Sequence, residues 1–351
     1  MSLVVGFPRL MTEVVKSERC TLCGTCHAIC PVRVIGIDEK PKLVGRCVFC
    51  DLCYAFCPMV DDAFKASEYQ LLNPVFKNEY IGSYTSVYST RSKLKEVLAV
   101  AQDGGFVTSL LIYLIEKRIV DGAIVTVVDE EWRPRPIVAT TRKEVVDGAG
   151  SSYVVSPNLK ILHEAVVEKR LKKLAVVGTP CQINAIRKLQ LHPQISGLGK
   201  AIYLTIGLFC TESFDYDVLR RRIEQDKVNL MEVKKFAIIK GKFLATAKDG
   251  RNLMDVPIKV LKDVARRSCQ VCGDFTAEYA DISVGSVGSP DGWSTVIIRS
   301  EKGSDIFSKL VKGRRIEAVP LEQVKSAIKL SMKKRESAKT QLNFINPPEI
   351  G

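Results

Sequence analysis

Eight of the twelve cysteines lie in one short stretch near the N-terminus, in two copies of one spacing. Each copy reads C-x2-C-x2-C-x3-C-P and closes on Pro31 or Pro58. The eight residues are Cys20, Cys23, Cys26, Cys30, Cys47, Cys50, Cys53 and Cys57. Thiolates at this spacing bind the irons of [4Fe–4S] clusters, which carry single electrons. The pattern therefore predicts one-electron transfer.

Bacterial two-cluster ferredoxins use the same spacing, because the fourth cysteine of each copy is carried away to bind the other cube. We therefore expect one cluster on Cys20, Cys23, Cys26 and Cys57. We expect a second cluster on Cys47, Cys50, Cys53 and Cys30. The alternative is a pair of zinc sites or a disulfide knot, since eight cysteines are too many for one zinc ion.

The other four cysteines come from three separate segments. Cys181 follows a Gly-Thr-Pro turn after an apolar run, Cys210 closes a second apolar run, and Cys269 and Cys272 form a C-x2-C pair. Strand ends meet at one edge of an α/β sheet, so these thiols are expected to form a third [4Fe–4S] site. The alternatives are that Cys181 and Cys210 are buried small apolar residues and that the C-x2-C pair binds zinc.

Helical and apolar β patterns alternate through the middle of the chain, with helices expected over 106–115, over 158–170 and from Cys181 onward. This alternation indicates an α/β core with a largely parallel sheet. A DG turn divides an expected antiparallel stretch over 230–260. A basic helix is expected over 321–339, with Leu321, Val324, Ile328 and Met332 on one face. The fold class is α/β, mixed α+β overall. The expected domains are a ferredoxin-like module over 1–66, a linker over 67–92 and a core over 93–351.

Bulk composition is that of a soluble globular protein, with 46% hydrophobic and 26% charged residues in a chain of 351. No apolar run is long enough to span a bilayer, and the first residues lack a signal-peptide pattern. A reducing, cytoplasmic environment is therefore expected. The formal net charge is +13, of which residues 1–70 contribute none. This surplus suits an anionic cofactor, an acidic partner or a phospholipid surface, and no nucleic-acid reader motif is present.

Five separated blocks resemble the beta subunit of coenzyme F420-reducing hydrogenase and its relatives. They are GGFVTSLLIYLIEKRIVDGAIV, GSSYVVSP, GTPCQINAIRK, GLFCTE and CQVCGDFTAEYADISVGSVGSPDGWSTV. The resemblance spans roughly 93–300 and implies an FAD-binding α/β core whose single [4Fe–4S] cluster is bound by Cys181, Cys210, Cys269 and Cys272. The added ferredoxin module makes the chain more similar to the input subunit of reduced-F420 dehydrogenases.

Candidate flavin-binding residues follow from the same resemblance. Gly104 and Gly105 precede a helix that carries Thr108 and Ser109, and a helix start offers free N–H groups to a pyrophosphate. The alternative is a C-cap of the preceding helix. The segment Ser151, Ser152 and Tyr153 is a candidate for the isoalloxazine edge, with an ordinary loop as its alternative.

Basic residues before the C-x2-C pair are candidates for the phosphates of FAD or for the phosphate and carboxylates of F420. They are Lys259, Arg266 and Arg267, and the alternative is a solvated basic face. No catalytic residue is assigned, because hydride transfer depends on positioning rather than on a strong acid or base.

The electron count of the cofactors gives a functional hypothesis. A deazaflavin transfers two electrons as a hydride, a cubane accepts one, and a flavin converts between them. We expect electrons to pass from reduced F420 to FAD, through three clusters, to the partner subunits of a larger complex. The alternatives are the reverse reaction in a hydrogenase, formate dehydrogenase or ferredoxin-linked complex, and a non-enzymatic electron-transfer adaptor. The basic helix is expected to pack on the core, or else to lie on an anionic membrane or an acidic subunit. The alternative to a free cytoplasmic location is the cytoplasmic membrane face, reached through partner subunits.

Overall fold

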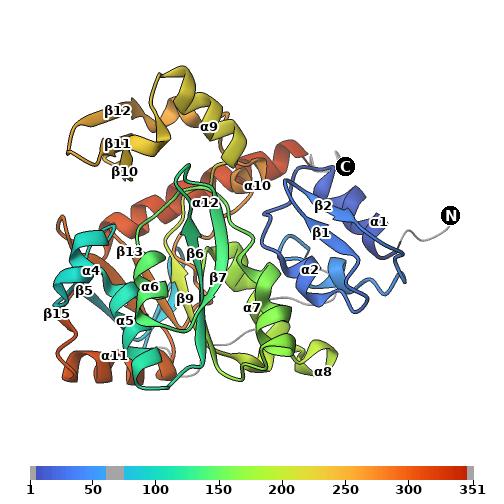
Figure 1. The fold of residues 1–351 in the computed structure, drawn as a ribbon, viewed down its shortest axis with the longest axis horizontal. Helices are drawn as coiled ribbons and strands as arrows, with labels where there is room; N and C mark the ends of the chain where they lie inside the picture. The colour runs from blue at the N-terminus through green and yellow to red at the C-terminus, as the bar shows by residue number, and fades with distance from the viewer. Residues whose placement is uncertain (1–4, 61–74, 346–351) are drawn as a thin grey trace.

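An eight-stranded sheet forms the centre of the computed structural model, which describes residues 5–60 and 75–345 (Figure 1). Its strand order is β15-β5-β14-β13-β9-β8-β6-β7. The strands are β5 (Ser86–Ser92), β6 (Gly122–Val128), β7 (Pro134–Ala139), β8 (Leu174–Gly178), β9 (Ile202–Leu208), β13 (Ile282–Gly285), β14 (Ser294–Ile298) and β15 (Ile316–Pro320).

The four strands β6, β8, β9 and β13 pair in parallel, and the outer strands pair with their neighbours antiparallel. The expectation of a largely parallel sheet is thus correct only for its centre. Strand β8 is buried along its whole length, as expected for a parallel strand that is covered on both faces. The mixed α/β fold class is confirmed.

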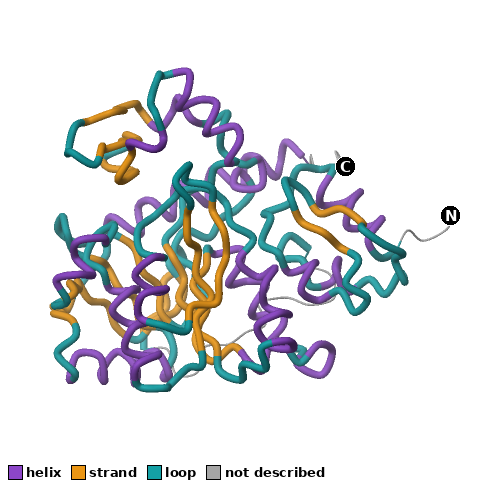
Figure 2. Tube along the Cα trace, viewed as in Figure 1, coloured by secondary structure: helices purple, strands orange, loops and turns teal. Residues whose placement is uncertain are grey.

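Helices cover both faces of the sheet (Figure 2). One face packs against α4 (Lys95–Val100), α5 (Phe106–Glu116), α6 (Arg142–Asp147) and α11 (Glu301–Lys312), through side chains such as Phe106, Leu110 and Phe307. The other face packs against α7 (Pro180–Leu191), followed by α8 (Pro193–Ser196). The predicted helices at 106–115 and after Cys181 are therefore present.

The cysteine-rich N-terminal module packs directly against α7. Its elements are α1 (Phe7–Leu10), η1 (Met11–Val15), α2 (Thr25–Ile29), β1 (Ile35–Ile37), β2 (Pro41–Leu43) and α3 (Leu52–Ala55). Ala28, Ile29 and Phe56 of this module belong to the same apolar cluster as Ile183 and Ile186 of α7. The module and the core thus share a continuous apolar interface.

A small lobe follows the carboxyl end of β9 and lies at the top of the molecule in Figure 1. It contains α9 (Tyr216–Gln225), η6 (Leu230–Glu232), β10 (Val233–Ile239), β11 (Lys242–Ala247), β12 (Asn252–Pro257) and η7 (Ile258–Leu261). The three strands are antiparallel, as predicted, and Gly250 of the DG turn has a φ of 91°. The short helix α10 (Arg267–Gln270) returns the chain to the core.

The linker expected over 67–92 is wrong in its second half. Residues 75–92 contain β3 (Phe76–Asn78), β4 (Gly82–Tyr84) and β5, and β5 pairs with both β14 and β15. The buried residues of β5 include Ser89, Thr90 and Ser92, so its pattern is not apolar. Residues 67–74 lie outside the described part of the chain.

Two expected helices differ in their bounds. The helix expected over 158–170 is a 3-10 turn, η3 (Asn158–Ile161), followed by a π turn, η4 (Glu164–Glu168). The basic helix begins later than expected, as α12 (Lys325–Ile345), because the N–H of Leu321 continues the pairing of β15 by donating to Val87. Its buried residues include Ala327 and Ser331, so the described helix packs on the core.

Candidate functional site

The structure brings Cys20, Cys23, Cys26 and Cys57 together. Their side chains are close enough for their charges to interact, although Cys57 lies two residues beyond the end of α3. All four line one cavity, whose walls include the aliphatic side chains of the N-terminal helical segment, Leu10, Val14 and Val15. A cavity that is walled by aliphatic groups and lined by four thiols fits the donor set of a [4Fe–4S] cluster.

The second predicted group also assembles. The charge of Cys53 interacts with Cys47, Cys50 and Cys30, and the last of these is carried over from the first copy of the motif. The loop turns sharply here, since Phe49 has a φ of 55°. The N–H of Phe49 donates to Cys47 Sγ at 3.4 Å, an interaction that favours a thiolate. Cys50 is exposed, so this group lies at the protein surface.

The third group comes from three elements of the core. Cys181 lies in the first turn of α7, Cys210 follows β9, and Cys269 and Cys272 lie in and after α10. Their charges interact with one another. A capping box formed by Thr179 fixes the start of α7, and the Thr179 hydroxyl lies 3.2 Å from Cys181 Sγ.

Burial raises the pKa of these thiols. The pKa of Cys53 and that of Cys269 rise to about 12, chiefly because each side chain is removed from water. The pKa of Cys26 and that of Cys181 also lie well above the usual value for the same reason. Iron binds the thiolate, so cluster binding would displace these protons, and a cationic Fe–S core would offset the negative charge of the thiolates.

Among residues 5–60 and 75–345, no three side chains of histidine, cysteine, aspartate or glutamate converge as the ligands of a single metal ion do. This observation concerns single ions, whose ligands all approach one centre. The four thiolates of a cubane each bind a different iron and are therefore spread further apart.

The three cysteine groups follow one another in space. Cys23 of the first group is close enough to Cys181 of the third for their charges to interact. Cys26 of the first group interacts in the same way with Cys53 of the second. The first group therefore lies between the third group, whose four cysteines are half-buried, and the second group, whose Cys50 is exposed.

Polar contacts hold the N-terminal module on the core at this point. Lys188 is only 2% exposed, and its ammonium donates to the carbonyl oxygen of Cys57 at 2.7 Å and to that of Val60. The Arg266 guanidinium donates to the carbonyl of Cys20 at 2.9 Å and to Asp215 at 3.2 Å. These contacts join the backbone of the first cysteine group to α7 and to the start of α10.

Gly24 lies where the N-terminal module and the core approach each other closely. A Cβ on Gly24 would lie 2.3 Å from the backbone nitrogen of Lys160, and its φ of 97° also favours glycine. Beside it, the N–H of Leu159 donates to the carbonyl of Cys23 at 3.0 Å. The loop that carries the first cysteine group therefore packs directly on η3.

The expected pyrophosphate site lies at the start of α5. Gly105 precedes the helix with a φ of 72°, and no side chain caps the first N–H groups. Gly104 packs tightly, since a Cβ there would lie 2.3 Å from the carbonyl oxygen of Thr90. Thr108 is buried, and the buried Ser109 hydroxyl bonds to Ser92 Oγ at 2.7 Å. The helix start therefore offers backbone donors, while Ser109 is held by a neighbour.

The other flavin candidates lie between the core and the small lobe. Tyr153 has a φ of 59°, and its hydroxyl accepts from Gln102 Nε2 at 3.3 Å and from the N–H of Ile238 at 3.2 Å. Burial raises the pKa of Tyr153 to about 12. Ser151 and Ser152 precede it in an irregular, half-buried segment.

The basic candidates do not form one group. Lys259 is exposed on η7 of the small lobe, and Arg267 is exposed beside Glu18 at 3.8 Å. Arg266 instead contacts the first cysteine group. Lys188 was not expected from the sequence, because lysine is common on helices and nothing in its spacing distinguishes it.

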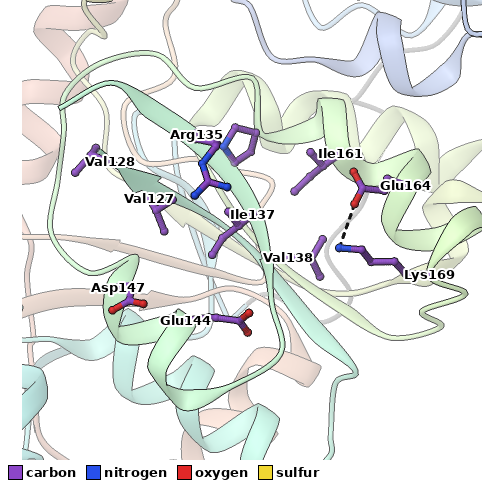
Figure 3. A pocket seen from close by; sticks show the side chains of 11 residues that line it. Val127, Val128, Arg135, Ile137, Val138, Glu144, Asp147, Ile161, Glu164 and Lys169 are labelled. Atoms are coloured by element: carbon purple, nitrogen blue, oxygen red, sulfur yellow. Dashed lines mark ion pairs between the residues drawn. The ribbon is translucent and has the colours of Figure 1, made fainter. Parts of the chain in front are cut away.

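A surface hollow of about 760 Å³ lies elsewhere, over the edge strand β7 (Figure 3). Figure 3 shows Arg135 and Ile137 on the strand and the ion pair between Glu164 and Lys169, which measures 3.1 Å. No residue that was predicted to bind a cluster or a flavin lines this hollow.

Family models match most of the chain. The coenzyme F420 hydrogenase/dehydrogenase beta subunit N-terminal model matches residues 87–163, and the C-terminal model matches 171–324. A 4Fe-4S binding domain model matches 13–36.

Membrane-spanning helices are absent from residues 5–60 and 75–345, where no helix has the length and apolar character that a span requires.

Several curated proteins are similar over most of this length. The beta subunit of coenzyme F420 hydrogenase from Methanosarcina barkeri is 42% identical over 263 residues, which are 74% of this chain and 90% of the relative. A subunit of the F(420)H(2) dehydrogenase from Methanosarcina mazei is 33% identical over 86% of this chain and 84% of the relative. The coenzyme F420-dependent sulfite reductase of Methanocaldococcus jannaschii is 38% identical over 92% of this chain, which spans only 50% of that relative.

A solved structure shares the fold. A chain of the xenon-derivatised F420-reducing [NiFe] hydrogenase complex from Methanosarcina barkeri superposes with a TM-score of 0.74 at 39% identity, covering 77% of this chain and 95% of that chain.

Proposed function

The chain belongs to the coenzyme F420 hydrogenase/dehydrogenase beta-subunit family, and on that premise we propose that it oxidises reduced coenzyme F420. In this proposal FAD accepts the hydride and releases electrons one at a time. Three [4Fe–4S] clusters then conduct the electrons to a partner subunit. Family membership already supports the coarser function, which is iron–sulfur electron transfer within an F420-related oxidoreductase.

The observation that carries the proposal is the serial order of the three cysteine groups. The core group on Cys181 neighbours the first group through Cys23, and the first neighbours the surface group through Cys26 and Cys53. A path that leads from the core to the exposed Cys50 suits electron flow from a flavin held by the core to an external partner. The residues that would hold the clusters are the twelve cysteines, four per cluster.

Residues around the start of α5 support the flavin part of the proposal. The uncapped N–H groups after Gly105 suit the pyrophosphate of FAD, and the tight packing of Gly104 keeps that loop close to the sheet. The loop also contacts the small lobe, since Lys235 Nζ donates to the carbonyl oxygen of Gln102 at 2.6 Å. The lobe therefore contacts both Tyr153 and the loop before α5, and the proposal places the flavin and F420 beside these contacts.

The electron exit is proposed at the surface cysteine group. Cys50 is exposed there, and its neighbours Val48 and Phe49 are 53% and 57% exposed. Exposed apolar side chains beside a redox centre suit contact with a partner protein. The relatives are named as subunits, which supports the proposal that this chain also works with partner subunits.

Chemically reduced F420, added anaerobically to the purified chain, tests the function. The proposal predicts bleaching of the flavin absorbance together with an EPR signal from reduced clusters. A chain that holds flavin and clusters but is reduced by dithionite and not by reduced F420 would contradict the substrate assignment. A chain with three clusters and no flavin would instead be an electron-transfer adaptor.

The reverse direction is the second candidate, favoured by the 42% identity to the beta subunit of a coenzyme F420 hydrogenase. In that case electrons enter at the surface group and reduce F420 at the flavin. Supplying reduced ferredoxin or a low-potential dye with oxidised F420, and comparing the two initial rates, distinguishes the directions.

A further inference from the structure

The last long helix places a lysine against the core cysteine group. Along α12 the buried residues Ala327, Ser331 and Ala338 recur at helical spacing, and Lys334 lies on the same face. The Lys334 ammonium donates to the carbonyl oxygen of Cys210 at 2.6 Å. This face is therefore turned toward the third cysteine group rather than toward solvent.

A second bond ties the same ammonium to the C-x2-C loop. Lys334 Nζ donates to the carbonyl oxygen of Asp274 at 2.8 Å, two residues beyond Cys272. The two acceptor carbonyls thus belong to the two loops that carry Cys210, Cys269 and Cys272. Helices α10 and α12 are in contact, and the next residue, Arg335, forms an ion pair with Glu278.

Charge reinforces this geometry. The Lys334 ammonium interacts with the side chains of Cys272, Cys210 and Cys269, and with the carboxylate of Asp274. Three of the four predicted ligands of the core cluster are therefore within the field of one cation. Hydrogen bonds and nearby charge are two of the means by which a protein sets the potential of a cluster.

We propose that Lys334 is a positioning residue for the core [4Fe–4S] cluster, which holds the Cys210 and Cys269–Cys272 loops together and raises the cluster's reduction potential. The inference rests on the proposed function, in which Cys181 completes this ligand set. One-electron reduction adds one negative charge to the cluster, and a fixed cation nearby stabilises the reduced form more than the oxidised form. Lys334 would thereby make the core cluster a better acceptor for electrons from the flavin.

The test is an EPR-monitored redox titration of the full anaerobic chain carrying Lys334→Met. The core signal is identified as the one that Cys181→Ser removes. At a fixed potential the ratio of reduced to oxidised core cluster is expected to fall about tenfold, which is about 59 mV for a one-electron couple. The two ferredoxin-type clusters are expected to titrate unchanged and serve as an internal reference.

Matched variants separate charge from structure. Lys333→Met removes an exposed lysine from the adjacent position and is expected to titrate as wild type. Lys334→Arg is expected to restore the potential, and Lys334→Gln, which keeps a donor but not the charge, is expected to lower it.

An unchanged midpoint in Lys334→Met and Lys334→Gln overturns the inference. If the Lys334→Met chain does not bind the core cluster, the midpoint potential of the core cluster in Lys334→Gln tests the inference instead. A wild-type chain that lacks a core signal would instead contradict the three-cluster function itself, before Lys334 is tested.

Discussion

Replacing Lys188 with methionine is expected to loosen the N-terminal module from the core. The Lys188 ammonium is buried and donates to the backbone carbonyls of Cys57 and Val60, across the interface between α7 and the module. Methionine has a similar length but donates no hydrogen bond, so the change removes these contacts without opening a large cavity.

The magnitude follows from those two bonds. A hydrogen bond that involves a charged group contributes about 1.5–3 kcal/mol, so the pair contributes about 3–6 kcal/mol. Methionine avoids the cost of burying an ammonium, so a net loss near the lower end, about 3 kcal/mol, is expected. That loss corresponds to a roughly 150-fold larger population of the undocked module.

Hydrogen exchange measures this population. Amide protons of residues 52–60 are expected to exchange roughly 150-fold faster in Lys188→Met. This ratio applies when the module recloses faster than the open amides exchange, so that the exchange rate is proportional to the undocked population. Peptides from β8 and β9, at the centre of the sheet, are expected to exchange as in wild type. Lys200→Met, which changes an exposed lysine, is the matched control. Equal exchange of residues 52–60 in all three proteins would refute the view that Lys188 holds the module.

Three other outcomes are expected. Cys181→Ser should lower the iron content from about twelve to about eight per chain, because only the core cubane loses a ligand. Asp281→Asn should lower the free energy of unfolding by about 3–5 kcal/mol in urea, since it removes a buried carboxylate charge that lies 3.3 Å from the buried Arg187 guanidinium. Asp305→Asn, at an exposed ion pair, should cost at most about 1 kcal/mol. Burial alone would raise the pKa of Asp281, but the Arg187 charge and hydrogen bonds from Thr205 and Ser300 lower it. The stability that this carboxylate contributes should therefore be complete above the usual aspartate pKa and be lost as the pH falls through the lowered pKa. Asp281→Asn should not show this loss in acid.

The cysteine groups could be predicted from the sequence because their spacing follows from the geometry of cluster binding. The repeated motif predicted that Cys30 and Cys57 are exchanged between the two groups, and the structure places each beside the expected cysteines. Cys181 and Cys210 could be joined to the C-x2-C pair because each follows a strand of the parallel centre of the sheet.

Other features depend on tertiary contacts that no local pattern reveals. Strand β5 was missed because its inward residues, such as Thr90, are polar and are satisfied by the neighbouring strand. Arg299 gives no sequence signal, yet it is fully buried and binds the carbonyls of Ile81 and Ser83, which joins the β3–β4 segment to the core. Lys188 and Lys334 were missed for the same reason, since only the folded chain places their ammonium groups beside cysteine carbonyls.

Iron, sulfide and flavin content of the anaerobically purified chain tests the central claim most directly. Three cubanes and one flavin predict about twelve irons, about twelve inorganic sulfides and about one FAD per chain. A colourless chain that contains zinc, or a chain whose iron content stays near eight after complete reconstitution, would contradict the assignment of all twelve cysteines to clusters.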